Sequence, residues 1–205
     1  MVTAFFVFIV AFSGFATFWG FHCFFSPFIL FYRGIFLQET YVIEDILFYD
    51  SLTSDMGIWT KSSGTSIVSY NSNGLTFTGN GQYQDQFLTL NHTFMGDYCV
   101  SVTVTSIING ETSGIVVDGV FFENCGYSQS QRGTLGDSST WERISPQIQN
   151  NDVVSLHKIG NEVKIYLNNV LLSTKTINSE YVGVVMLKTY VSRTFTIKNL
   201  KIKEL

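Results

Sequence analysis

Hydrophobic and polar positions alternate in short runs from residue 50 to the C-terminus, and Gly, Asn, Ser and Asp separate the runs. Residues 98–105 show this most plainly, because Tyr or Val occupies every second position and Cys, Ser or Thr the others. Such a strand buries one face and exposes the other. With roughly ten short strands and no helical stripe longer than a turn or two, the pattern predicts an all-β sandwich of two antiparallel sheets.

Two dipeptides predict tight hairpins in the second half of the chain. Gly160-Asn161 and Asn168-Asn169 each lie between runs that alternate in hydrophobicity. Gly and Asn tolerate the positive φ that two-residue hairpin turns require. Three consecutive antiparallel strands are therefore expected over residues 153–176.

The last strand carries an irregularity that predicts a β-bulge. Phe195 and Ile197 have one parity along the strand, whereas Leu200 and Ile202 have the opposite one. A regular strand cannot bury both pairs on one face, but a strand with one extra residue can. We therefore expect a bulge near Lys198–Asn199.

Residues 1–37 form a different kind of segment. Twelve of the 19 phenylalanines lie in the first 36 residues, where Arg33 is the only charged side chain. Residues 2–32 are long enough to span a bilayer. No basic residue precedes them and no small-x-small cleavage site follows, which disfavours a cleaved signal peptide. Three interpretations stay open: a membrane anchor or uncleaved signal, the product of a misassigned start, or an arm buried in a larger assembly.

Charge excludes one class of function. The formal net charge is −4 and the isoelectric point is near 5.3. An electrostatic nucleic-acid binder needs a stripe of Lys and Arg. The densest basic cluster consists of Lys198, Lys201 and Lys203, which we interpret as solvated positions on the last strand. No nucleic-acid partner is expected.

Several segments have the residues of a known set of strands, namely residues 47–52 and 57–60 (LFYDSL and GIWT), 73–79 (NGLTFTG), 153–156 and 160–169 (VVSL and GNEVKIYLNN), 182–185 (VGVV) and 196–202 (TIKNLKI). In this order they resemble the concanavalin A-like (laminin-G-like jelly-roll) domains, and the resemblance covers residues 45–205. It implies a jelly-roll sandwich. Asn169 departs from the Asn-Gly turn that is more usual in the family. The superfamily includes lectins, laminin-G modules, glucanases, 3-keto-disaccharide hydrolases and viral or phage surface proteins, among which the fold does not choose.

Catalytic signatures are missing from the sequence. The glucanases of this fold carry a Glu-x-Asp-x-Glu strand that sets carboxylates on one face, and no such triplet occurs. Asp118 and Glu123 have opposite parity, which predicts opposite faces of a strand. His92 and His157 are isolated from any nucleophile pattern. The C-terminal residues 199–205 do resemble the end of 3-keto-disaccharide hydrolases, so a glycoside hydrolase is kept as a third hypothesis.

A ligand surface is predicted in the polar stretch from residue 124 to 141. Neutral-sugar sites combine an aromatic platform with a few hydrogen-bonding side chains. The candidate residues of this kind are Tyr127, Gln129, Gln131, Arg132 and Trp141. The alternative is that Tyr127 and Trp141 cap the core.

Three further sites are weighed against simpler interpretations. Cys99 and Cys125 either form a disulfide or are two free thiols. Asp50 could join a calcium site, or it is a strand-end residue, and no other cofactor or metal is expected. Asn91 begins an Asn-x-Thr glycosylation sequon, which matters only in an exported eukaryotic protein.

The leading hypothesis is a non-catalytic module that binds a carbohydrate or cell-surface polymer and is extracellular or displayed on a surface. A structural or assembly protein of a virion or phage tail, which packs against itself or other chains, is the alternative. Membrane attachment would come from residues 2–32.

Overall fold

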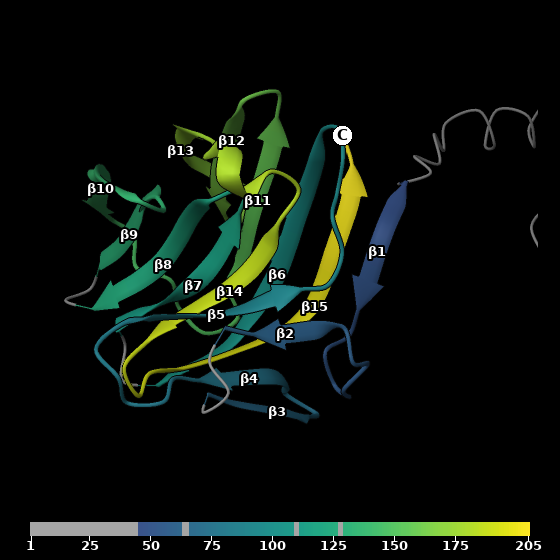
Figure 1. The fold of residues 1–205 in the computed structure, drawn as a ribbon, viewed down its shortest axis with the longest axis vertical. Coiled ribbons are helices and arrows are strands. Elements are labelled where there is room, and N and C mark those ends of the chain that lie inside the picture. The colour runs from purple at the N-terminus through teal and green to yellow at the C-terminus, as the bar shows by residue number, and fades with distance from the viewer. Residues whose placement is uncertain (1–44, 63–65, 109–110, 127–128) are drawn as a thin grey trace, which may run out of the picture. The chain divides into compact units, whose positions relative to one another are not determined.

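The computed structural model describes residues 45–62, 66–108, 111–126 and 129–205. They form a sandwich of two antiparallel sheets (Figure 1), which confirms the predicted all-β fold. Sheet A contains β1 (Ile46–Asp50), β3 (Ile67–Asn71), β4 (Gly74–Thr78), β6 (Tyr98–Ile108), β11 (Val153–Ile159), β12 (Glu162–Leu167), β13 (Val170–Thr176) and β15 (Thr194–Glu204). Sheet B contains β2 (Trp59–Lys61), β5 (Asp85–Leu90), β7 (Glu111–Val117), β8 (Val120–Gly126), β9 (Gln129–Thr134), β10 (Asp137–Ile144) and β14 (Val185–Tyr190).

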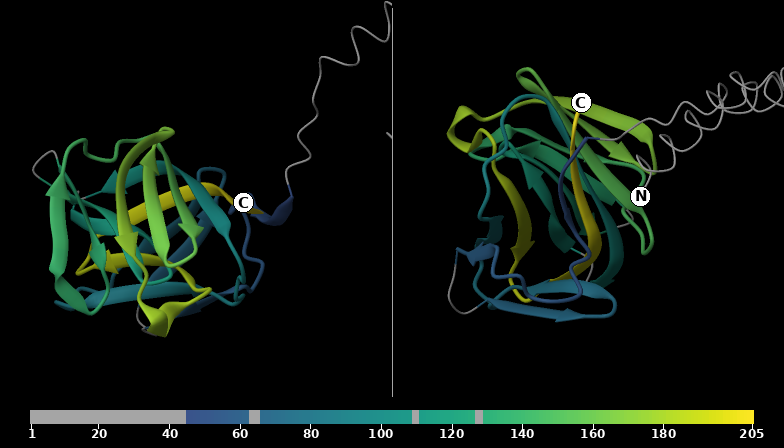
Figure 2. Two further views of the ribbon diagram at one scale, coloured as in Figure 1. Left: turned by 90° about the horizontal axis from the view of Figure 1, so that it is seen from above. Right: turned by 90° about the vertical axis from the view of Figure 1, so that its right-hand side faces the viewer.

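The order of the strands brings distant parts of the chain together. Sheet A runs β13-β12-β11-β6-β15-β4-β3, with β1 also paired to β15. Sheet B runs β10-β9-β8-β7-β14-β5-β2, so β14 lies between two strands that precede it by many residues. Figure 2 shows the two sheets as separate layers, with β14 and β15 in opposite ones. A short 3-10 helix, η1 (Ser179–Tyr181), precedes β14.

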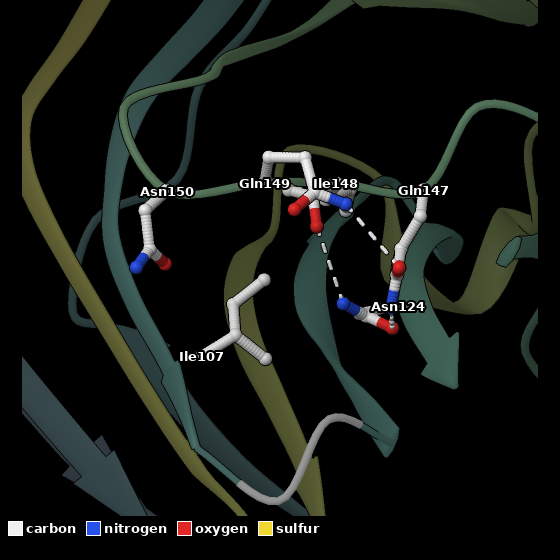
Figure 3. A pocket seen from close by; sticks show the side chains of 6 residues that line it. All are labelled: Ile107, Asn124, Gln147, Ile148, Gln149 and Asn150. Carbon is white, nitrogen blue, oxygen red and sulfur yellow. Dashed lines mark hydrogen bonds between the residues drawn. The ribbon is translucent and has the colours of Figure 1, made fainter. Parts of the chain in front are cut away.

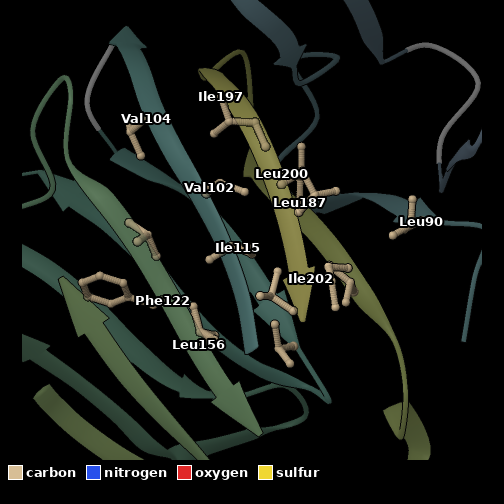
Figure 4. Packing of buried hydrophobic residues seen from close by; sticks show 14 of the residues in the cluster. Leu90, Val102, Val104, Ile115, Phe122, Leu156, Leu187, Ile197, Leu200 and Ile202 are labelled. Carbon is tan, nitrogen blue, oxygen red and sulfur yellow. The ribbon is translucent and has the colours of Figure 1, made fainter. Parts of the chain in front are cut away.

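The core lies between the two layers. The alternation predicted for residues 98–105 is confirmed, because Tyr98, Val100, Val102 and Val104 are at most 1% exposed. Figure 4 shows apolar side chains from both sheets pointing into the same space. The labelled members are Leu90, Val102, Val104, Ile115, Phe122, Leu156, Leu187, Ile197, Leu200 and Ile202.

Both predicted hairpins are confirmed. Strand pairing closes each turn with two residues, since Ile159 pairs with Glu162 and Leu167 pairs with Val170. Asn168 and Asn169 have φ of 50° and 66°, the left-handed conformation that this turn type needs and that Asn tolerates. The two asparagines therefore form the two-residue turn without a glycine.

The predicted bulge is also confirmed. The register of β15 against β6 shifts between Lys198 and Lys201, and Asn199 adopts φ of 55°. The extra residue restores the parity, so that Ile197 and Leu200 are both fully buried. With one inserted residue, the apolar side chains on both sides of the bulge thus face the core.

The predictions made for residues 1–37 lie outside the described residues. Within the part of the chain that the structure describes, no helix has the length and apolar composition needed to cross a membrane.

Candidate functional site

One row of side chains crosses the face of sheet B that is turned away from sheet A, which we call the outer face. Phe122 and Leu187 point into the core between the sheets. Their neighbours Glu123 and Lys188 therefore point outward. Residues paired between strands share a face. The row that contains these two residues consists of Arg143, Gln131, Glu123, Gly114, Lys188 and Phe87.

A buried ion pair lies in the middle of this row. The Nζ of Lys188 on β14 is 2.7 Å from the Oε2 of Glu123 on β8, although β7 runs between the two strands. Gly114 is the β7 residue that lies between them. A Cβ on Gly114 would come within 2.6 Å of the Cβ of Glu123 and 2.1 Å of the carbonyl oxygen of Phe122. Because Gly114 has no side chain, the side chain of Lys188 can cross β7 at this position and reach Glu123.

The ammonium of Lys188 has further partners from other strands. The Oδ1 of Asp85 on β5 is 3.2 Å away. The ring centroids of Phe121 and Trp141 lie 4.8 Å and 5.8 Å from Nζ, so both rings interact favourably with the cation. Lys188 and Glu123 are 2% and 1% exposed, whereas the side chain of Asp85 is 31% exposed. Asp85 is therefore the member of the cluster that solvent or a ligand can reach.

Burial dominates the electrostatics of Glu123. Loss of hydration raises the pKa of its carboxyl group, and the attraction of Lys188 offsets only part of this. Its second oxygen, Oε1, is buried and has no hydrogen-bond partner. With all three groups charged, the cluster of Lys188, Glu123 and Asp85 carries one excess negative charge. Beneath the outer face, these three side chains therefore form a rigid cluster with a slight excess of negative charge.

Trp141 lies beside this cluster on a fixed support. Its indole Nε1 donates to the carbonyl of Thr134 at 3.1 Å. The ring meets Phe121 edge-on, with centroids 5.4 Å apart and planes at 87°. A Cβ on Gly133 would lie 2.5 Å from the Cδ1 of Trp141, so the indole fits where that side chain is missing. Trp141 remains 40% exposed. It packs on the outer face and leaves part of its ring open.

The other predicted ligand residues on β9 do not all lie on the same face of sheet B. Gln131 lies in the same row as Glu123, and Gln129 has the same parity on β9. Arg132 has the opposite parity and binds Glu142 and, at 2.6 Å, the carbonyl of Leu172 on β13 of sheet A. It therefore ties the two sheets together away from the Trp141 face. Tyr127 lies outside the described residues.

Asp85 and Lys188 were missed from the sequence, and Glu123 was considered there only as a partner of Asp118 in a catalytic carboxylate pair. A signal was present, because Lys188 and Glu123 each interrupt a run of apolar residues, VVMLKTY and VFFENC. A charge in such a run is buried and must be paired. The two residues are 65 positions apart, and local pattern does not reveal that β14 lies near β8.

A concave feature lies at the end of the sandwich (Figure 3). It is a cavity of about 310 Å³, lined by Ile107, Asn124, Gln147, Ile148, Gln149 and Asn150. Ile107 comes from β6 of sheet A and Asn124 from β8 of sheet B, and the other four residues come from the connection between β10 and β11. The cavity therefore lies where the two layers meet that connection.

The Cys99–Cys125 disulfide considered from the sequence is not formed. Cys99 lies in β6 of sheet A and Cys125 in β8 of sheet B. Each has the parity that points away from the core, so both layers separate the two sulfur atoms. Packed sheets are about 10 Å apart, and a disulfide requires Cα atoms within about 7 Å.

Asp50 and Asn91 occupy different surroundings. Asp50 is 3% exposed, its Oδ1 accepts a hydrogen bond from the Leu52 amide at 2.7 Å, and its Oδ2 has no hydrogen-bond partner. Across the described ranges, no group of three or more His, Cys, Asp or Glu residues is arranged to hold a metal ion. Asn91 is exposed and accepts a hydrogen bond from Thr60.

Comparison with known proteins gives a result for the fold alone. No protein-family model and no curated protein sequence matches the chain. Among solved structures, carbohydrate-binding module CBM66 from Bacillus subtilis has a TM-score of 0.52 and 14% identity, covering 72% of this chain and 96% of that one. A structure described as an endo-acting O-glycanase of the human gut microbiota has a TM-score of 0.54 and 10% identity, covering 78% and 100%.

A third similar structure is the GlcNAcα1-4Gal-releasing endo-β-galactosidase from Clostridium perfringens, with a TM-score of 0.56 and 8% identity, covering 79% of this chain and 62% of that one. At these identities the likeness concerns architecture. The chain therefore shares with these solved structures the fold of a sandwich of two antiparallel sheets.

Proposed function

We propose that this protein is a non-catalytic carbohydrate-binding domain that holds a glycan on the outer face of sheet B. The observation that carries the proposal is the half-exposed indole of Trp141, fixed on Phe121 beside a buried ion pair. An indole of this kind offers an apolar face to the C–H side of a sugar ring. Its hydrogen bond to Thr134 leaves it little freedom to lose on binding.

The side chains around Trp141 supply hydrogen bonds. Gln131 can both donate to and accept from a hydroxyl group. Asp85, the accessible carboxylate of the cluster, accepts from hydroxyl groups, and Arg143 donates from the end of the row. At the Asp85 end of the row, the accessible carboxylate favours an uncharged glycan over an acidic one. A few polar groups around an apolar platform are typical of sugar sites.

Hydrolysis is the function that this cluster most nearly supports as an alternative. Asp85 and Glu123 contact the same nitrogen, so their nearest oxygens lie within about 6 Å of each other. Carboxyl groups of retaining glycosidases are about 5–5.5 Å apart. Glu123 is 1% exposed and is held by Lys188, so its carboxyl group does not reach the bond of a glycan on the surface. Binding is therefore the better-supported function.

An assembly role is supported by a separate observation. β13 is an edge strand of sheet A, and its first residues Val170 and Leu171 are 61% and 51% exposed. Apolar residues on an open edge favour pairing with another chain.

In the glycan-binding proposal the protein is exported or displayed on a surface, and residues 2–32 serve that export or attachment.

The test compares the full-length protein with two variants on a panel of neutral and acidic glycans. Trp141→Ala removes the platform, and Tyr49→Ala removes an aromatic side chain, 55% exposed, from sheet A. We expect neutral glycans to bind the wild type and Tyr49→Ala alike, and Trp141→Ala about ten- to a hundredfold more weakly, which is the loss expected on truncation of a tryptophan hot spot. Equal binding by Trp141→Ala would exclude this surface. Release of reducing ends from a bound glycan would instead establish the hydrolase alternative.

A further inference from the structure

The cavity at the end of the sandwich is lined by side chains of one chemical kind. Four of its six lining residues, Asn124, Gln147, Gln149 and Asn150, carry primary amides. The other two, Ile107 and Ile148, are apolar, and none is charged. Its volume of about 310 Å³ falls at the lower end of the range for small-ligand sites. It is large enough for one small polar molecule.

The amides form a directional chain, which Figure 3 shows as dashed lines. Gln149 Nε2 donates to Gln147 Oε1 at 3.2 Å, and Gln147 Nε2 donates to Asn124 Oδ1 at 3.0 Å. Asn124 is 2% exposed and donates to the carbonyl of Ile148 at 3.3 Å. Each amide is oriented by its neighbour. Asn150, which is exposed, makes no side-chain hydrogen bond to the described part of the protein, and Figure 3 shows no dashed line from its amide.

The connection that carries these residues is fixed before any ligand binds. Ser130 Oγ donates to the carbonyl of Pro146 and accepts from the amide of Ile148, both at 3.0 Å. Asp152 Oδ2 accepts from the backbone amide of Gln149 at 2.7 Å. The Asn151 amide donates to the carbonyl of Val104 on β6, also at 2.7 Å. A preformed rim loses little entropy on binding.

We infer that this cavity is a second binding site, which takes one uncharged sugar unit. A primary amide presents a donor and an acceptor side by side, and adjacent hydroxyl groups of a sugar present the complementary pair. The partly buried side chain of Ile107 provides an apolar contact for the C–H face of the ring. An ionised ligand would lose hydration and find no opposite charge in the lining. The inference extends the proposed function in its ligand class but concerns another place on the domain.

Sheet B separates this cavity from the Trp141 surface. Glu123 and Asn124 are consecutive residues of β8, and their side chains point to opposite faces. Glu123 belongs to the outer face, while Asn124 points inward to the cavity. The two sites share no lining side chain, so their ligands can be assigned independently.

The experiment is an NMR titration of the full-length protein, labelled with nitrogen-15 and carbon-13, with four probes: glucose, galactose, N-acetylglucosamine and glucuronate. The side-chain NH2 signals of Gln149 and Asn150 report on the cavity, and the indole NH signal of Trp141 reports on the outer face. We expect the two amide signals to shift saturably with at least one neutral sugar and to stay in place with glucuronate. The three neutral probes distinguish a hexose from an N-acetylhexosamine.

Two variants and a matched control complete the test. The double variant Gln149→Ala/Asn150→Ala changes only exposed side chains, so its fold should persist. We expect it to bind the neutral sugar about tenfold more weakly, because two hydrogen bonds are lost. The affinity is measured from the shifts of the Ile107 and Ile148 methyl signals. Gln84→Ala, another exposed amide, and Trp141→Ala should bind at this site as the wild type does.

Unchanged affinity in the double variant, an equal response to glucuronate, or the absence of saturable shifts would each overturn this second site. Because the glycan panel with Trp141→Ala tests the outer face, failure of one site is distinguishable from failure of the other.

Discussion

Lys188 binds Glu123 across an intervening strand, and the two residues are the only oppositely charged pair in the described ranges whose side chains are both at most 2% exposed. The contact depends on the tertiary arrangement of β8, β7 and β14 and on the missing side chain of Gly114. Removal of one partner from such a pair leaves the other charge buried. The same ion pair therefore stabilises sheet B and supports the proposed glycan-binding surface from beneath.

Glu123→Ala should lower the free energy of unfolding by about 3–5 kcal/mol, because the ammonium of Lys188 then retains Asp85 as its one acidic partner in the cluster. Lys188→Met should cost a similar amount. The double variant Glu123→Leu/Lys188→Met should recover much of the loss, since it leaves no buried charge. Urea unfolding of the wild type, both single variants and the double variant measures this coupling. Additive losses would mean that the pair does not act as a unit.

Gly114→Ala tests the path that Lys188 takes across β7. The new Cβ would come within 2.6 Å of the Cβ of Glu123, so the strands or the ion pair must shift. We expect a loss of about 1–3 kcal/mol in the free energy of unfolding, the usual cost of overpacking. Thermal unfolding monitored by circular dichroism provides the measurement. Stability equal to that of the wild type would show that sheet B accommodates the methyl group freely.

The acid dependence of stability should report Asp118, which directly follows β7. It is fully buried, accepts hydrogen bonds from Tyr98 Oη at 2.6 Å and the Gly183 amide at 2.8 Å, and has an unpartnered Oδ2. Burial raises the pKa of its carboxyl group above the ordinary 3.8. The folded state therefore binds this proton more tightly than the unfolded state, and the contribution of Asp118 to stability grows as pH falls from neutral toward 3.8.

Asp118→Asn keeps the acceptor for Tyr98 and removes the titration. Its stability relative to the wild type should be higher at pH 7 than at pH 4, because only the wild type gains from protonation at Asp118. Urea midpoints at several pH values between 4 and 7 provide the comparison. A difference between the two proteins that is independent of pH would contradict the raised pKa.

Gln131 and Arg132 are neighbours that should behave differently. Arg132→Ala loses the bond to the Leu172 carbonyl that joins the two sheets, so stability should fall by about 1–3 kcal/mol while glycan affinity stays the same. Gln131→Ala changes the outer face and should weaken glycan binding several-fold at unchanged stability. Calorimetric titration and urea unfolding of both variants separate the two effects. Loss of affinity in Arg132→Ala without loss of stability would make Arg132 a ligand residue.

Residues 45–205 should fold without the apolar segment, because the described core lies within residues 48–202. We expect a soluble protein with a β-sheet circular dichroism spectrum and one cooperative unfolding transition. Light scattering would show whether the exposed edge of β13 leads to self-association. An insoluble or unfolded product would show that the sandwich needs the preceding residues.

Local features of the fold were predictable and the arrangement of the site was not. The turns at residues 160–161 and 168–169 follow from residues with access to positive φ, and the bulge follows from a change of parity within one strand. The contact between Lys188 and Glu123 depends instead on which strands become neighbours. Gln131 and Trp141 were selected by residue type and share the outer face, whereas the parity of Arg132 already placed it on the other side.

The bulge at Asn199 also determines how sheet A divides. Before it, residues 194–197 pair with β4, and after it, residues 200–203 pair with β1, while β6 follows the strand on its other side. On one side, β15 therefore pairs with two strands in succession, first β4 and then β1. Deletion of Asn199 would give the apolar residues of both halves one parity, so a regular strand could bury them all, but β15 would lose the offset at which it passes from β4 to β1.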